Sequence, residues 1–446
     1  MRTRRAYIFL TFLLGLWLQV VWGQVKLSEP ASLYHPGLAR QLAFDPTFSL
    51  LWRGSTQEAI AFRSSVVDWI DSLNAIQLIE RPYHVAMLRR LQVEKGPSRW
   101  TFDHDSSHLV GLYFLDALLA ASFDLYRGGE GGSFVGYDVI SRSYRHQDDS
   151  VILAGIVKAR HLEQLRRWFF SLEPNRPTYL LLRSAMLSRL KKLQKSRSSL
   201  VVDDTLVKLK HSLRQQRWLT HFGLDRYLVV NVAAAEASYV VNGETSITMR
   251  AIVGKPATPT PRFASYCKQL ILYPYWYVPA SIAIGEYLSK IKKDPRWLDH
   301  RNMQVIDPKG RVVDHHQLNW GSFSARYFPY IIRQSTGCDN ALGVLKFDLE
   351  TPYGVYLHDT NHKTAFLQPS RFLSHGCIRL EEPLLLGSRL LPEGLDTAYL
   401  QSCFADKKPI VRPLPAPLPV FCLYLPASVD PQGLVRIHRD VYKLLK

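Results

Sequence analysis

The chain has 446 residues, of which 47% are hydrophobic and 21% are charged, and its formal net charge is +18. The length predicts two or three domains. The balanced composition excludes a disordered chain and a polytopic membrane protein, and the positive charge favours a polyanionic partner.

The amino terminus has the pattern of an export signal. Arginines at positions 2, 4 and 5 precede an apolar run from Ala6 to about Trp22, and the small residue Gly23 follows. We expect residues 1–23 to be a secretory signal peptide. An uncleaved membrane anchor is the alternative. Either places the rest of the chain outside the cytoplasm. There, its basic charge favours a membrane surface or a carboxylate-rich wall as partner, and we expect it to bind no nucleic acid.

The first half of the chain has helical periodicity. Apolar residues recur at intervals of three and four, as in the segment 58–80, and the segment 108–128 is apolar enough for a buried helix that ends at glycine. These patterns predict a helical scaffold domain at 26–185. The basic residues that follow predict a helical connection at 186–222, with lysines and arginines on a solvated face.

After about residue 225 the pattern changes to short alternating runs separated by turns. Residues 226–232 and 237–254 are expected to be strands, and Asn242-Gly243 between apolar runs predicts a hairpin. Further strands are expected at 341–350 and 354–360, with a carboxy-terminal hairpin or tail at 426–446. A mainly β domain after a helical one predicts an α+β fold.

The chain has five cysteines, at positions 267, 338, 377, 403 and 422. In an oxidising compartment an odd number leaves at least one thiol unpaired, and we expect this to be Cys377. For the other four, a disulfide and a small buried apolar side chain remain alternatives.

The stretch RFLSHGCIRL at 371–380 surrounds Cys377 with residues that suit a nucleophile. A thiol attacks as the thiolate, so it needs a neighbouring imidazole or cation. His358 lies 19 residues earlier at the end of an expected strand, so the chain can return it to the cysteine. His375 is too close in sequence to reach the sulfur from an extended backbone. We therefore predict His358 as the base, and Arg379 on the same face as Cys377.

The residues beside these two side chains also suit a site. Gly376 permits the unusual backbone angles needed where amides converge on an oxyanion, and the Cys377 amide is one expected donor. The polar pair Asp359-Thr360 after His358 suits a strand end at the mouth of a site.

Together, SHGCIR and the upstream YLHDT resemble the signature of L,D-transpeptidases with the YkuD-type catalytic fold. The stretches PYWYVPASIA, FPYIIRQSTGCDNALGVLKF and GLVRIHRDVY are similar to those of the larger periplasmic members. The resemblance implies an amino-terminal helical scaffold domain followed by a mainly β catalytic domain at 223–425. It also implies a capping insertion over the site at about 275–340.

The same resemblance implies the roles of the site residues. Cys377 would be the nucleophile and His358 the general base, with no metal and no cofactor. The residues implied to bind substrate or the oxyanion are Tyr356, Ser374, His375, Gly376 and Arg379. The chain departs from the family pattern in lacking a separate wall-binding module and in having Cys338 where a non-cysteine residue is expected.

The implied function is peptidoglycan L,D-transpeptidation in the periplasm, in cell-wall biogenesis and the maintenance of cell shape. Cys377 would form a thioester with a tetrapeptide stem and release D-alanine, and the amine of a second stem would resolve it to a 3→3 crosslink. The implied partners are donor and acceptor stems, with a wall-linked lipoprotein as another acceptor. Carbapenems should acylate the same sulfur.

Three alternatives remain from the sequence. The same fold could use water as acceptor and act as an L,D-carboxypeptidase or amidase. The chain could instead be a non-catalytic wall-binding protein. In the third alternative, the histidines at 358, 362 and 375 would bind zinc together with Cys377.

Overall fold

In the computed structural model the chain forms two compact units, divided near residue 175, and residues 131–145 belong to the second unit. The expected signal peptide or anchor at 1–23 lies outside the described residues. Among the helices that are described, none has the length and apolar character needed to cross a bilayer. The structure describes residues 33–44, 56–76, 78–79, 83–89, 104–129, 134–159, 161–195, 203–403 and 408–445.

The amino-terminal unit is helical, as the periodicity predicted. Thr56 caps helix α4 (Gln57–Ala75) by accepting a hydrogen bond from the Ala59 amide at 3.2 Å. This helix ends five residues before the end of the periodic segment 58–80. Helix α6 (His104–Arg127) ends directly before Gly128 with φ +73°, so the predicted stop at glycine is confirmed. Its helices, with most of α7, are α2 (Pro36–Ala43), α4 (Gln57–Ala75), α6 (His104–Arg127), α7 (Ser141–Lys158) and α8 (Leu162–Ser171).

The carboxy-terminal unit is built on a 10-stranded sheet, ordered β1-β5-β10-β11-β13-β4-β3-β2-β14, with β12 paired to β4. Strand β14, at the end of this order, pairs in parallel with β2 and antiparallel with β5, so the sheet closes on itself around an apolar core. The strands are β1 (Tyr137–Asp138), β2 (Arg226–Asn231), β3 (Glu236–Val241), β4 (Glu244–Gly254), β5 (Phe263–Leu272), β10 (Leu345–Leu349), β11 (Leu357–His358), β12 (Phe372–Ser374), β13 (Ile378–Leu380) and β14 (Ile410–Leu423), with the hairpin β15 (Ala427–Val429) and β16 (Val435–Ile437).

Most of the expected strands are present. β3 and β4 are joined by Asn242 and Gly243, both with positive φ, as the hairpin prediction required. The run 354–360 forms only the two-residue strand β11. The helices of the amino-terminal unit precede a β-rich unit along the chain, so the α+β class is confirmed.

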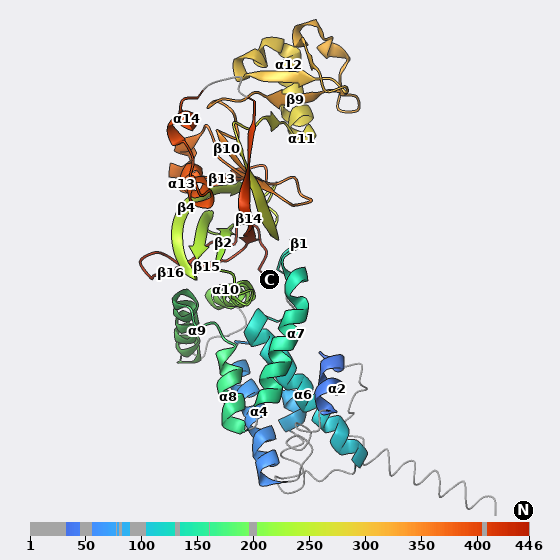
Figure 1. Ribbon diagram of the computed structural model, residues 1–446, viewed down its shortest axis with the longest axis vertical. Coiled ribbons are helices and arrows are strands. Elements are labelled where there is room, and N and C mark those ends of the chain that lie inside the picture. The colour runs from blue at the N-terminus through green and yellow to red at the C-terminus, as the bar shows by residue number, and fades with distance from the viewer. Residues whose placement is uncertain are drawn as a thin grey trace, which may run out of the picture. The chain divides into compact units, whose positions relative to one another are not determined.

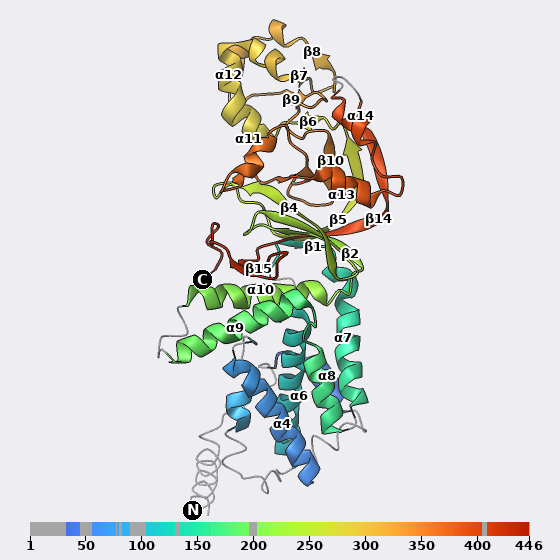
Figure 2. The same cartoon turned by 90° about the vertical axis from the view of Figure 1, so that its left-hand side faces the viewer.

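Besides the helices of residues 276–334, which are described below, this unit contains α9 (Pro177–Lys195), α10 (Asp204–Thr220), α13 (Pro383–Leu390), α14 (Thr397–Gln401) and the 3₁₀ helix η7 (Lys363–Leu367). Gln215 in α10 donates to the Tyr424 carbonyl at 2.8 Å, and Ser212 accepts from the Ala427 amide at 2.8 Å. The segment 186–222, expected as a basic helical connection, is helical in the end of α9 and throughout α10. It is not solvated throughout, because α10 packs on the carboxy-terminal strands and buries Lys208 and Arg217. Both views place α9 and α10 at one end of the closed sheet (Figures 1 and 2).

Residues 276–334, here called the cap, fold at the opposite end of the sheet, within the range expected for the insertion (Figures 1 and 2). They have their own four-stranded sheet, in the order β6-β9-β7-β8, and their own apolar core, which includes the fully buried Ile291, Leu298, Val305 and Ile332. The strands of the cap are β6 (Trp276–Tyr277), β7 (Met303–Ile306), β8 (Val312–Val313) and β9 (Ile331–Gln334). Its helices are α11 (Ala280–Ile282), η2 (Ala283–Tyr287), α12 (Leu288–Lys293), η3 (Pro295–Trp297), η4 (Asp299–Arg301), η5 (His315–Gln317) and η6 (Trp320–Ser322).

Both stems of the cap are fastened near α14. Before the cap, the Tyr273 hydroxyl donates to the Tyr399 carbonyl at 2.6 Å. After it, Cys338 forms a disulfide with Cys403, with Cα atoms 5.0 Å apart. The cysteine that departed from the family pattern therefore has a structural partner.

We expect the double substitution Cys338→Ser/Cys403→Ser to lower the free energy of unfolding of this unit by up to about 4 kcal/mol, because the disulfide closes a loop of 65 residues. Chemical denaturation of the parent and the variant measures the difference. The matched control is reductant, which should move the parent to the variant's midpoint and leave the variant unchanged. A parent insensitive to reductant would show that the two thiols are unpaired.

Candidate functional site

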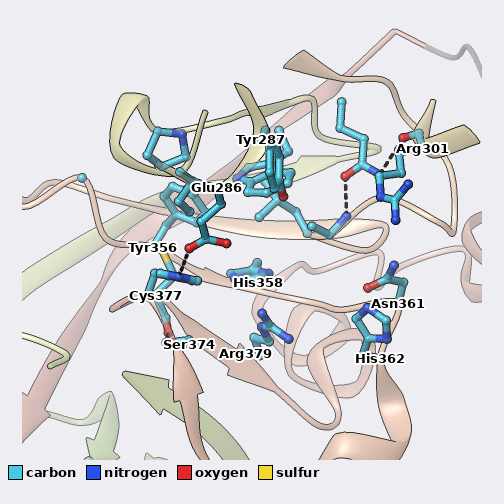
Figure 3. Close-up of a pocket in the computed structure, with 18 of the residues that line it drawn as sticks. Glu286, Tyr287, Arg301, Tyr356, His358, Asn361, His362, Ser374, Cys377 and Arg379 are labelled. Carbon is cyan, nitrogen blue, oxygen red and sulfur yellow. Dashed lines mark hydrogen bonds and ion pairs between the residues drawn. The ribbon is translucent and has the colours of Figure 1, made fainter. Parts of the chain in front are cut away.

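The site lies where β11 and β13 pair in parallel, with His358 opposite Arg379. The same register puts Tyr356 beside Cys377, where the Ile378 amide donates to the Tyr356 carbonyl at 3.1 Å. Alternate residues of a strand share one face. Two side chains from each segment therefore project from one face of the sheet, and the predicted base and nucleophile are diagonal neighbours on it (Figure 3).

The backbone before Cys377 is fixed by its neighbours. Gly376 has φ +119°, which a side chain would strain, although a Cβ there would meet no heavy atom closer than 3.8 Å. The Ser374 hydroxyl accepts from the Gly376 amide at 3.1 Å and donates to the Cys377 carbonyl at 2.6 Å. Ser374 lines the pocket while its hydroxyl sets the direction of the chain at the cysteine.

The turn after β4 fixes this segment by hydrogen bonds. The Thr260 hydroxyl donates to the Gly376 carbonyl at 2.8 Å and accepts from the Gly254 amide at 2.8 Å. The Tyr442 hydroxyl donates to the Gly254 carbonyl at 2.5 Å and accepts from the Thr260 amide at 3.2 Å. A tyrosine near the carboxy terminus is therefore part of the support of the nucleophile.

His358 has the tautomer that a base requires. Its Nδ1 lies 2.5 Å from the Asp359 carbonyl, which can only accept, so Nδ1 carries the proton and Nε2 keeps its lone pair. Burial, with the positive charge of Arg379, lowers the pKa of His358 to about 3. The imidazole is neutral at neutral pH.

The two polar residues after His358 do not lie at an open mouth, as the sequence suggested, because Asp359 and Thr360 are both buried. The Asp359 carboxylate accepts from the Val344 amide at 3.0 Å and pairs with Lys363 at 2.5 Å. A Cβ on Gly343, which has φ +59°, would lie 2.2 Å from this carboxylate. The carboxylate fixes the backbone whose carbonyl holds the imidazole.

The Cys377 thiol is also neutral at neutral pH. Burial raises its pKa, while the Tyr356 backbone and the positive charges of Arg379 and Lys346 act to lower it. Burial is the largest effect, and the net direction is upward. The pair in the resting site is thus a thiol and a neutral imidazole, whereas the sequence predicted a thiolate.

Arg379 has no anionic partner in the part of the chain that the structure describes. Its Nε is buried and makes no hydrogen bond, and no described carboxylate forms an ion pair with it. Burial lowers the pKa of its guanidinium, which nevertheless stays charged at neutral pH. A buried donor without a partner is expensive, so this one is suited to an anionic ligand.

The cap forms the other wall of a cavity of about 830 Å³ (Figure 3). The exposed ring of His375 reaches it, with Nε2 hydrogen-bonded to the Glu286 carboxylate at 2.8 Å. Tyr356 contacts both walls, because its hydroxyl forms a hydrogen bond with Trp276 of the cap. Burial and the charge of an ionised Cys377 raise the pKa of this hydroxyl. The hydrogen bond with Trp276 lowers it, and the net direction is upward. The cavity is large enough for a peptide of a few residues.

The structure brings the predicted Tyr356, His358, Ser374, His375, Cys377 and Arg379 to this cavity. Gly376 is buried, does not line the cavity and acts through its backbone. The cap residues Trp276, Glu286, Tyr287 and Arg301 were not predicted as site residues; Trp276 lies in the stretch PYWYVPASIA that contributed to the resemblance, whereas no motif distinguishes the other three. The aromatic run 273–277 was the only signal near them.

The zinc site considered from the sequence is not formed, because His358, His362, His375 and Cys377 do not bring three donor atoms together. Among the described residues, three donor atoms within 4.8 Å of one another occur elsewhere, at Asp299, His315 and His316 of the cap.

We expect Gly343→Ala to lower the free energy of unfolding by about 1–2 kcal/mol for its positive φ, and by about 1–3 kcal/mol more for the contact with Asp359. Gly310→Ala is the matched control, since Gly310 has φ +79° and open space around it. Thermal unfolding measures both. Equal losses in the two variants would show that the Asp359 carboxylate yields freely.

We expect the rate of Cys377 alkylation by iodoacetamide to rise with pH, with a midpoint above the pKa of an exposed cysteine, because burial raises the pKa of the thiol. Arg379→Met should move the midpoint higher, since it removes a cation that favours the thiolate. Lys268→Met, an exposed cation paired with Glu350, is the control. The buried thiols of Cys267 and Cys422 should not compete. A midpoint below that of exposed cysteine would instead show a resting thiolate.

Comparisons with known proteins agree on one family. Residues 225–391 match the family model YkuD, the L,D-transpeptidase catalytic domain. A putative L,D-transpeptidase of Haemophilus influenzae is 32% identical over 216 residues, which cover 48% of this chain and 44% of that protein. The chain therefore spans less than half the length of this curated relative.

Solved structures show a more distant likeness. An L,D-transpeptidase from Mycobacterium smegmatis is 18% identical, with a TM-score of 0.22, over 44% of this chain and 58% of that one. L,D-transpeptidase 1 of Mycobacterium tuberculosis is 16% identical, with a TM-score of 0.18, over 45% and 61%. Values this low leave the assignment to the sequence matches. On those matches, residues 225–391 are similar to the YkuD family of L,D-transpeptidase catalytic domains.

Proposed function

We propose that the protein is a peptidoglycan L,D-transpeptidase that uses Cys377 as its nucleophile and His358 as its general base. The observation that carries the proposal is the pairing of β11 with β13. It sets a thiol, a neutral imidazole with a free Nε2 and an unpaired guanidinium side by side in one cavity under the cap. These groups suit acyl transfer through a thioester.

In the first half-reaction the Cys377 sulfur attacks the carbonyl that joins an L-centre of the stem to its terminal D-alanine. Because both partners are neutral at rest, the thiol proton passes to Nε2 of His358 as the carbon–sulfur bond forms. The resulting imidazolium then gives this proton to the amine of D-alanine as the carbon–nitrogen bond breaks. Substrate binding must bring the two diagonal side chains into contact, as is common when ligand-free sites close.

The transition state needs a donor for its oxyanion, and the Cys377 amide is the candidate. Among the described hydrogen bonds, none uses this amide, whereas the Gly376 amide is already bonded to Ser374. One such donor is worth about 3–4 kcal/mol in related chemistry. We assign Arg379 to a carboxylate of the donor stem, since its buried Nε lacks any acceptor.

In the second half-reaction an amine attacks the thioester carbonyl, and His358 takes one of its protons and returns it to the departing sulfur. If the amine is the side chain of another stem, the product is a 3→3 crosslink. We place the enzyme in the periplasm, against an acidic wall that suits its net charge of +18. A lipoprotein lysine or a free amino acid would be resolved by the same steps.

We expect the full chain, incubated with disaccharide-tetrapeptide, to gain the mass of the donor minus D-alanine. D-alanine is lost because the thioester replaces the terminal peptide bond. Cys377→Ala lacks the sulfur that forms this thioester, so its mass should not change. His358→Gln should slow formation of the adduct by about 10²–10⁴-fold, the usual contribution of a positioned base. Intact-protein mass spectrometry measures both.

The products distinguish this proposal from its alternatives. A crosslinked dimer supports transpeptidation, whereas tripeptide without dimer would show an L,D-carboxypeptidase. An adduct that persists in Cys377→Ala would show another nucleophile. The absence of any adduct, with the thiol still open to alkylation, would favour a wall-binding protein without catalysis.

A further inference from the structure

We propose that the cap holds a binding site for one divalent transition-metal ion, with Asp299, His315 and His316 as its ligands. Asp299 belongs to η4 and the two histidines to η5. The Nε2 atoms of both histidines lie 3.1 Å from the Asp299 carboxylate, each near a different oxygen. The site is separate from the catalytic cysteine and plays no part in the proposed function.

The distances match those in a metal site. Zinc bonds to imidazole nitrogen and carboxylate oxygen are about 2.0–2.2 Å long, so neighbouring ligand atoms of a tetrahedral site lie about 3.3 Å apart. The two nitrogen–oxygen distances are close to this value, and all three donor atoms lie within 4.8 Å of one another. A small movement of the side chains would complete the set.

The direction of one nitrogen supports the same conclusion. Nε2 of His315 is buried and makes no hydrogen bond, although the carboxylate oxygen is 3.1 Å away. The ring therefore does not point at that oxygen. Ligands of a shared ion have this relation, because their lone pairs converge on the centre of the site and not on one another.

The backbone that carries the ligands is already fixed. Asp314 caps η5 by accepting from the His316 amide at 3.0 Å and from the Gln317 side chain at 2.9 Å. The Trp320 indole donates to the His315 carbonyl at 2.8 Å, and Trp320 is part of the cap core. Little ordering remains to be done when an ion binds.

The two kinds of donor determine the class of ion. Imidazole nitrogen favours Zn²⁺, Co²⁺, Ni²⁺ or Cu²⁺ over Ca²⁺ and Mg²⁺, which prefer oxygen. The side chains of His316 and Asp299 are 50% and 45% exposed, so an ion can enter and keep a water as a fourth ligand. The ion would join η4 to η5, and His300 and Arg301 of the same η4 turn line the active-site cavity.

The test uses the full chain in a Cys377→Ala background, which removes the catalytic thiol as a competing ligand. Isothermal titration of the metal-free protein with ZnCl₂ should show one ion bound through these ligands, and thermal unfolding should shift upward with ZnCl₂. Co²⁺ should give the visible absorption of a tetrahedral ion without a thiolate band.

Asp299→Asn and His316→Ala should each weaken zinc binding on the order of 100-fold or more, since even indirect partners of a metal contribute 10–100-fold. His161→Ala, an exposed histidine of α8's amino-terminal cap, should bind as the parent does. Melting of each variant without zinc shows that the fold is intact. Zinc binding that survives both substitutions, or no binding by the parent, would overturn the proposal.

Discussion

The site depends on one constraint, the parallel register of β11 and β13. Two residues from each segment reach one face only because Tyr356 lies beside Cys377 and His358 beside Arg379. A slip of one residue would turn one pair toward the core. The register is held from several sides, since β13 also pairs with β4 and β11 with β10.

Burial determines the charge state of the imidazole and the thiol. It lowers the pKa of the imidazole and raises that of the thiol, and the neighbouring cations do not reverse the second effect. Arg379 acts on both groups, because a positive charge opposes the imidazolium and favours the thiolate. Binding of a substrate carboxylate would neutralise this cation and make the imidazolium easier to form. If the proposed donor binds at Arg379, the guanidinium would link recognition of its carboxylate to the basicity of His358.

Much of this site could be predicted from the sequence, for reasons that are local. The strand before His358 and the SHGC turn each have clear patterns, and Gly376 indeed has the positive φ that only glycine adopts easily. The zinc alternative and the open mouth at Asp359-Thr360 were wrong, because composition does not show which way a polar side chain points. Glu286 and Trp276 could not be predicted, since their role comes from the folding of the cap back over the site.

The cap can form this wall because it is a separate folding element with fixed attachments. Its buried apolar side chains form a cluster of their own, distinct from the core of the 10-stranded sheet. Its two stems are tied to the chain around α14, one by the Tyr273 hydroxyl and the other by the Cys338–Cys403 disulfide. On the site side, the contact of Glu286 with His375 is polar and exposed, and such contacts contribute little free energy. The cap also contacts the sheet through the hydrogen bond of Trp276 with Tyr356, so it is attached both at its stems and on the site side.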